Sequence, residues 1–463
     1  MSPRLALVTL IGLLIWAAPA PDAVDPRAWR LLAIFVATVA GIIIKPLPIG
    51  AMALVGLAAA LATRTLTIAE ALSGFANATV WLVVSAFFLA AGFIKTGLGA
   101  RIAYALVTRF GRSTLGLGYS LVGADLVLAP LIPSNTARAG GIVFPILQSL
   151  ARVTAGSEST GHRRTRAFLT LAAYNGTVVT SAMFVTAMVA NPLVVQMASE
   201  QGVAMTWRLW ALAALLPGAA SLVVVPIVIY AMCARGVTPD GDAPGAAREA
   251  LARLGPLTRG EQVMAAVSIA LLAAWILGPA IGVDTTAAAV VAIAALLVTG
   301  VLSWDDLASD REAWNTFVWF AALGTMAAYL GEFGLTGWFT GEVRSMVGGV
   351  GWVPGFLGLV LIYFYTHYFF ASNTAHVSAM YAPFLAVALA LGTPPLLAAL
   401  GLGFSSSLFA GLTHYGTGPA PILSGSGHVP LGTWWKVGLI VSVANIAIWL
   451  VVGAIWWRII GLW

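Results

Sequence analysis

Long apolar segments separated by short polar connections run along almost the whole chain. They fall at residues 5–20, 29–44, 46–62, 78–98, 115–149, 167–198, 207–232, 262–282, 285–302, 314–335, 352–391, 394–424 and 434–460. About 20 apolar residues in a helix span the hydrocarbon core of a bilayer. The pattern predicts an all-α polytopic membrane protein with about eleven transmembrane helices. The first run has the short apolar core of a secretory signal, but we interpret it as an uncleaved helix because the rest of the chain is membrane-embedded.

Two runs, 115–149 and 352–391, are too long for one helix and too broken for two complete crossings. Each contains Pro, Gly or a polar triplet near its middle. Non-helical backbone is tolerated at membrane depth only where it is buried in protein or faces water. We therefore predict two re-entrant hairpins whose tips face a site.

An internal repeat divides the chain into two halves. The motif N-A-T-V-W begins at Asn77 and N-T-F-V-W begins at Asn315. From these asparagines to the serines of two later S-N-T triplets the spacing is 57 residues in both cases (134 − 77 and 372 − 315). Such register over a long span indicates duplication. We predict a first half at 1–233 and a second half at 261–463.

Arginine-rich connections orient the chain in the membrane. They lie at 99–114, 150–166 and 234–260, and the last is interpreted as the linker between the halves. The positive-inside rule places all three in the cytoplasm. Five predicted crossings separate the hairpins, so the first enters from the cytoplasmic side and the second from the outer side. This is an inverted-topology repeat, in which substrate binds near the bilayer midplane.

The two triplets are the strongest candidates for a binding site. Each is followed two residues on by a basic side chain, in the first copy Arg138 and in the second His376. Polar groups within apolar segments normally face a site or a water-filled cavity. Two facing tips could hold both ends of a dicarboxylate; the alternative is that the triplets only cap helices or bond across them. The candidate residues are Ser134, Asn135, Thr136, Ser372, Asn373 and Thr374.

Two further polar breaks follow the hairpins. Residues 174–181 read Y-N-G-T-V-V-T-S, and 414–421 read H-Y-G-T-G-P-A-P. Gly and Pro disfavour regular helix, so both segments are predicted to be unwound; a simple kink is the alternative. They add candidate substrate-binding residues, namely Thr180, Ser181, Gly416, Thr417, Gly418 and Pro419.

These paired triplets and breaks resemble the divalent anion:sodium symporters, also called di- and tricarboxylate transporters. The resemblance implies a homodimer with an elevator-type motion. In sodium-coupled members, Ser134 and Asn135 with 174–181 would form one sodium site, and Ser372 and Asn373 with 414–419 a second. The segment 414–421 is similar to the branch of plastid 2-oxoglutarate/malate translocators and bacterial citrate, tartrate and succinate antiporters.

Arg138 and His376 depart from the sodium-coupled pattern, in which these positions are usually small and neutral. A fixed cation would repel sodium and replace its neutralising charge. The sequence therefore favours sodium-independent exchange of dicarboxylates. Two structural alternatives remain: Arg138 could pair with Asp125, and His376 could be a neutral core histidine.

Composition limits the other function classes. The chain is 60% hydrophobic and 9% charged, which excludes a soluble globular protein. A net charge of +6 over 463 residues does not suggest nucleic acid as a partner. No phosphate loop, metal-ligand spacing or nucleophile–base set is evident, so we expect no cofactor, no resident metal and no enzymatic activity. We expect a multi-pass protein of a bacterial inner membrane, in contact with lipid. A sodium-coupled symporter is the close alternative, followed by a passive anion channel and an intramembrane enzyme.

Overall fold

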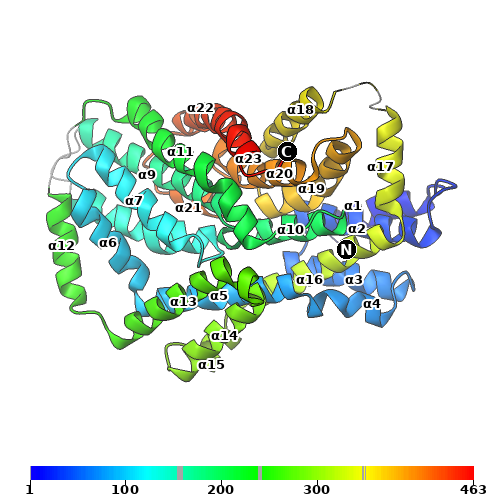
Figure 1. Ribbon diagram of the computed structural model, residues 1–463, viewed down its shortest axis with the longest axis horizontal. Helices are drawn as coiled ribbons and strands as arrows, with labels where there is room; N and C mark the ends of the chain where they lie inside the picture. The colour runs from blue at the N-terminus through cyan, green and yellow to red at the C-terminus, as the bar shows by residue number, and fades with distance from the viewer. Residues whose placement is uncertain (1, 154–159, 238–241, 347–348, 350) are drawn as a thin grey trace.

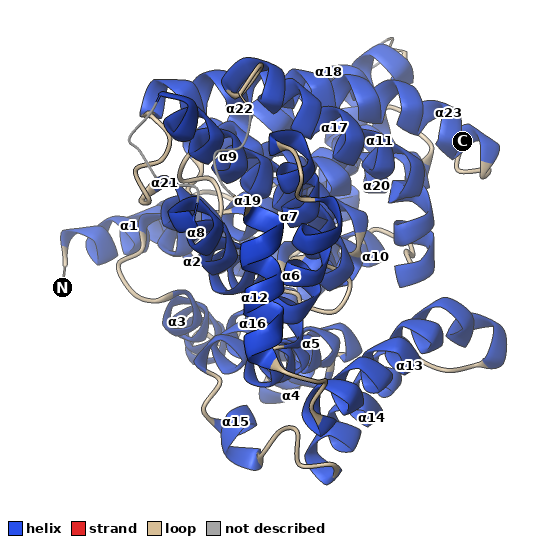
Figure 2. Ribbon diagram, turned by 90° about the vertical axis from the view of Figure 1, so that its left-hand side faces the viewer, coloured by secondary structure: helices blue, strands red, loops and turns tan. Residues whose placement is uncertain are grey.

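The structure is a computed structural model that describes residues 2–153, 160–237, 242–346, 349 and 351–463. Every regular element in these ranges is helical, which confirms the predicted class (Figures 1 and 2). Parts of two predicted basic connections, at 154–159 and 238–241, lie outside the described residues.

The helices of the first half follow the apolar runs closely, and a side chain or proline caps most of their N-termini. Asn77, for example, accepts a hydrogen bond from the backbone of Thr79 and begins α5 at the first repeated motif. The main helices are α1 (Pro3–Ala17), α2 (Pro26–Ile44), α3 (Ile49–Ala62), α4 (Ile68–Leu72), α5 (Ala78–Thr96), α6 (Leu98–Phe110), α7 (Thr114–Leu128), α8 (Phe144–Val153), α9 (Thr160–Met183), α10 (Ala190–Glu200) and α11 (Trp207–Cys233).

The linker contributes α12 (Ala243–Leu254), which packs against α6. The ion pair between Arg101 Nε and Glu261 Oε1, at 2.6 Å, fixes the chain where the second half begins. The helices that follow are α13 (Arg259–Ile281), α14 (Thr285–Val298), α15 (Trp304–Ala308), α16 (Arg311–Glu332), α17 (Leu335–Met346), α18 (Trp352–Tyr365), α19 (Asn373–Ala390), α20 (Pro395–Leu408), α21 (Pro419–Ser424), α22 (Leu431–Ile448) and α23 (Ala454–Ile459).

Seven described helices are long and apolar enough to cross a membrane, or eight if the bent pair α16 and α17 forms one span. Four shorter apolar helices, α1, α3, α7 and α14, accompany them. A polytopic membrane fold is therefore confirmed, while the number of about eleven crossings stays a prediction.

Both predicted hairpin runs contain two helical arms joined at the S-N-T triplet. In the first, α7 ends at Leu128, residues 129–134 are non-helical, and a π-helical turn over 137–143 leads into α8. In the second, α18 continues as a short 3₁₀ turn over 366–369, and α19 begins directly after Ser372.

One of the two predicted unwound segments is wrong. Residues 174–181 are helical within α9, and the break comes later, at 184–189. Gly176 packs tightly, since a Cβ there would lie 2.6 Å from Val122, and Thr180 donates to the Thr177 carbonyl. The amide of Asn191 donates to the carbonyls of Ser181 and Phe184, and Arg138 donates to that of Ala187, so side chains replace the helical hydrogen bonds at the break. The second prediction is confirmed in its main part: residues 413–418 are non-helical between the 3₁₀ turn that follows α20 and α21, although α21 has already begun at Pro419.

Helices from both sequence halves combine in two layers. In Figures 1 and 2 the lower layer contains α5, α13 and α14, and the upper layer contains α9, α11, α20 and α22. Helix α16 packs on α3 and α5, while α9 packs on α20 and α11 on α22. Neither layer is thus built from one half alone.

Candidate functional site

Both triplets line one cavity of about 280 Å³ between the layers. The upper layer contributes the two hairpin tips and both helix breaks, and the lower layer contributes α3, α5 and α16. The candidates that line it are Ser134, Asn135, Thr136, Ser372, Asn373, Thr374, Thr417 and Gly418.

The two serines have the same structural role, as N-caps. Ser134 Oγ accepts a hydrogen bond from Ala137 N at 3.1 Å, and Ser372 Oγ accepts from Ala375 N at 3.4 Å. The Asn and Thr of each triplet then occupy the first helical turn, whose leading N–H groups have no partner within the helix. Two positive helix ends therefore face one cavity, an arrangement suited to a doubly charged anion.

The asparagines connect each tip to the break of the other half. Asn135 Nδ2 donates to Thr417 Oγ1 at 3.0 Å, and Gly418 passes so close that a Cβ would lie 2.1 Å from Thr136 Oγ1. Asn373 Nδ2 donates to the carbonyl of Ser406 at 3.0 Å and contacts Met188 Sδ at 3.3 Å. The buried Oδ1 of Asn373 has no hydrogen-bond partner, which leaves an acceptor beside the cavity.

Arg138 lies behind the cavity wall and is fully buried. Its Nε donates to Asp125 Oδ1 at 3.1 Å, the pairing that the sequence left as the alternative. Its other nitrogens donate to the carbonyls of Ile132 and Ala187, both at 2.5 Å, and to Ser181 Oγ at 3.1 Å. Asp125 also accepts from the Thr180 hydroxyl. The predicted site residues Thr180 and Ser181 thus hold the ion pair and do not line the cavity.

The carbonyl oxygens around Arg138 come from the two interrupted segments of the first half. Ile132 precedes the first triplet, and Ala187 lies in the break after α9. Carbonyl, hydroxyl and carboxylate oxygens that converge on one point are the usual ligands of a hard cation. Here a guanidinium fills that point.

His376 is also buried and does not line the cavity. Its Nδ1 lies 3.0 Å from Nδ1 of His367, whose Nε2 lies 3.0 Å from the carbonyl oxygen of Gly416 in the second break. That oxygen can only accept, so Nε2 of His367 carries a proton, and a neutral His367 accepts from His376 at Nδ1. A pair of neutral imidazoles satisfies both contacts, as the core-histidine alternative requires.

Sequence reasoning missed His367 and the residues that α16 contributes to the cavity. Glu312, Asn315, Thr316 and Trp319 line the wall opposite the tips. Asn315 Oδ1 also accepts from Gly50 N at 3.2 Å and anchors α3. The repeated motif had marked Asn315 as a position of interest, but only for its register. Pro419 and Gly416 are placed beside the cavity wall rather than on it.

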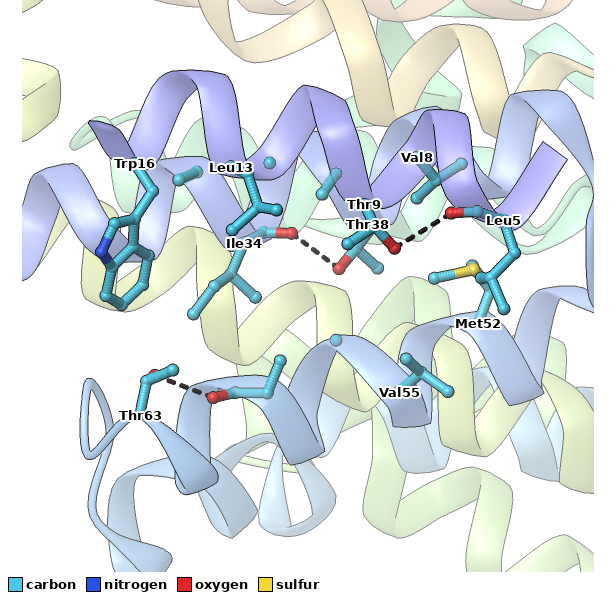
Figure 3. Close-up of a pocket in the computed structure, with 15 residues that line it drawn as sticks. Leu5, Val8, Thr9, Leu13, Trp16, Ile34, Thr38, Met52, Val55 and Thr63 are labelled. Carbon is cyan, nitrogen blue, oxygen red and sulfur yellow. Dashed lines mark hydrogen bonds between the residues drawn. The ribbon is translucent and has the colours of Figure 1, made fainter. Parts of the chain in front are cut away.

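A pocket of about 200 Å³ between α1, α2 and α3 shows the contrast with this site (Figure 3). Its three threonine hydroxyls donate to carbonyls of their own helices: Thr9 to Leu5, Thr38 to Ile34 and Thr63 to Ala59. The remaining wall is apolar, and no charged residue is among those that line it. A dianion would lose its hydration there without replacement.

Comparisons with known proteins show the family and the fold. Residues 2–463 match the family described as the sodium:sulfate symporter transmembrane region. YflS of Bacillus subtilis (strain 168), provisionally named a malate transporter, is 49% identical over 99% of this chain and 96% of its own length. Dicarboxylate transporter 1, chloroplastic, of Spinacia oleracea is 48% identical over 100% of this chain and 82% of its own length.

The crystal structure of the YdaH transporter of Alcanivorax borkumensis shares the fold. It has a TM-score of 0.60 and covers 87% of this chain and 89% of that chain, at 15% identity.

Proposed function

This chain belongs to the sodium:sulfate symporter family, and from that premise we propose that it exchanges di- or tricarboxylates across a membrane without sodium. The family relatives are transporters, and this chain is a transporter and not an enzyme. Their names, a malate transporter and a dicarboxylate transporter, support dicarboxylates as the substrate class. Succinate, malate, 2-oxoglutarate and tartrate are the candidates, together with the tricarboxylate citrate.

The observation that carries the proposal is the convergence of two serine-capped helix ends on one cavity. Each carboxylate of the substrate accepts hydrogen bonds from the leading N–H groups and from the Thr side chain of one tip, and at the first tip also from the second amide hydrogen of Asn135. Such charge-assisted bonds are each worth about 1.5–3 kcal/mol. Two tips provide for two carboxylates, which selects diacids over monoacids.

Exchange without sodium is supported by the occupied oxygen cluster around Arg138. A sodium ion placed a few ångströms from a guanidinium would meet repulsion of several kcal/mol even at an effective dielectric near 20. In the second half of the chain, His367 forms a hydrogen bond with the Gly416 carbonyl, an oxygen that could otherwise ligate a cation. The substrate, rather than a metal ion, is then bound by Ser134, Asn135, Ser372 and Asn373.

An elevator motion fits the layers. The upper layer carries both tips and both breaks, and the lower layer provides α3, α5 and α16. Sliding of the upper layer against the lower layer would carry the cavity through the membrane. We further propose a homodimer in a bacterial inner membrane, with the first hairpin on the cytoplasmic side and the second on the outer side.

Counterflow in proteoliposomes tests this function. Vesicles loaded with unlabelled malate should accumulate labelled succinate equally well in sodium and in choline buffers. Loss of uptake in choline would instead indicate a sodium-coupled symporter. Uptake that is indifferent to internal substrate would indicate a passive channel.

A further inference from the structure

A basic pocket of about 440 Å³ lies at the beginning of α9, far along that helix from the break beside the transport cavity. The C-terminal end of α11 and the loop before α22 complete its wall. Its ionisable lining residues are Arg163, Arg164, Arg166 and His428. No acidic residue is among the described residues that line it.

Among the described residues, the arginines of the basic pocket have no carboxylate partner. Arg164 donates to the backbone carbonyls of Cys233 and Arg235, and Arg163 donates weakly to Thr160 Oγ1 at 3.4 Å. Arg166 Nε is buried without any hydrogen-bond partner. None of the three is in the ion pairs that the described residues form. An unpaired cluster with a buried N–H donor is costly unless an anion binds there.

The pKa of His428 is affected by the positive charge of the basic pocket. It lies in the loop before α22, and Nδ1 is 3.1 Å from Thr170 Oγ1 of α9. Burial, together with the charges of Arg166 and His162, lowers the pKa of His428. The imidazole is thereby kept neutral, so it can accept one hydrogen bond and donate another to a bound anion.

The position of the pocket matches a lipid headgroup. Met232 and Cys233 at the end of α11 line it, as does Thr433 at the start of α22, so it lies where apolar helices end. Ile227, less than two turns before Met232, is 45% exposed, and Leu431 beside the pocket is 57% exposed. Acyl chains can lie against these residues while a headgroup reaches the arginines.

We propose that the basic pocket binds the phosphate group of an anionic phospholipid. Arginine forks bind phosphate oxygens bidentately, and basic pockets between transmembrane helices are suited to such headgroups. The pocket also touches the transport machinery, because α21 begins beside Gly418 and its following loop carries His428. Binding itself does not depend on the transport activity proposed above.

The test is lipid titration of the full chain in detergent, with bound phosphatidylglycerol and phosphatidylcholine counted by native mass spectrometry. Arg163→Gln with Arg166→Gln removes two cations and keeps Arg164, which holds the backbone. Each cation near the surface contributes about fivefold, so phosphatidylglycerol affinity should fall roughly 30-fold. Arg248→Gln, at an exposed position of α12, is the control and should leave the affinity unchanged; the unfolding temperature without lipid checks the fold.

Three outcomes would overturn the proposal. Phosphatidylcholine could bind as well as phosphatidylglycerol, or the Arg248 variant could lose as much affinity as the pocket variant. Alternatively, glycerol 1-phosphate could displace the lipid at equal concentration, which would assign the pocket to a soluble phosphate compound.

Discussion

Replacing Arg138 by glutamine tests whether its guanidinium stands in for a metal cation. The substitution removes one buried charge and the donors to Asp125, Ile132, Ala187 and Ser181. It leaves the Asp125 carboxylate, 1% exposed, with the Thr180 hydroxyl as its remaining partner. Removal of one member of a buried ion pair destabilises a protein by about 3–5 kcal/mol. We expect a loss of that size, together with loss of exchange.

Sodium should restore part of this stability in the variant alone. The vacated oxygen cluster then contains a carboxylate, two carbonyls and a hydroxyl, which is a ligand set for a small hard cation. Sodium at ten times its dissociation constant would return about 1.4 kcal/mol. The assay is thermal unfolding in matched sodium and choline buffers, for the wild type and for Arg138→Gln.

Lys95→Gln provides the control. It also breaks an ion pair, with Asp306 at a partly exposed position, and in the described part of the chain Lys95 Nζ donates to no backbone carbonyl. Its unfolding temperature should fall without any response to sodium. Two results would refute the reasoning about Arg138: equal stabilisation of all three proteins by sodium, or no stabilisation of Arg138→Gln by sodium.

Three further predictions concern the site and its surroundings. Asn135→Ala should reduce exchange at least tenfold, since one of its two amide hydrogens is donated to Thr417 and the other is available for a charge-assisted bond of about 1.5–3 kcal/mol to a substrate carboxylate; near-normal counterflow would remove this tip from the site. Gly418→Ala should raise the KM for succinate, because the new methyl group would lie 2.1 Å from Thr136 Oγ1 and has to displace that side chain; an unchanged KM would contradict the close approach. The pKa of His428 is lowered in the folded protein, so as the pH falls below the ordinary value of 6.5 the unfolded chain binds a proton at this histidine before the folded chain does. Acidification therefore favours the unfolded chain, and stability that is present above pH 6.5 is lost. His428→Gln should flatten the unfolding temperature between about pH 6.5 and 5, and an unaltered acid slope would exclude this histidine as its source.

Sequence reasoning was strongest where a local pattern has a local cause. Apolar runs predicted helices such as α5 and α11 almost to the residue, because burial in lipid demands length and apolarity together. The duplicated triplets predicted two tips at one cavity, since serine caps and polar first turns are encoded in adjacent residues.

Sequence reasoning failed where distant contacts decide the conformation. The break after α9 lies in F-V-T-A-M-V, which contains neither Gly nor Pro. Its freed carbonyl at Ala187 is satisfied by Arg138, 49 residues earlier. The polar stretch ending at Ser181 is helical because its hydroxyls serve that same arginine and Asp125. The wall from α16 was likewise invisible, because nothing in its own segment shows that it faces the tips.

Contacts at the two hairpin tips join the first half of the chain to the second half. Asn135 donates a hydrogen bond to Thr417, and Thr136 packs where a side chain at Gly418 would clash. Asn373 contacts the sulfur of Met188. A substitution at one tip therefore also changes a contact made by the other half of the chain. Severing the chain within the 234–260 linker should therefore yield two fragments that are inactive when expressed singly and complement one another when expressed together.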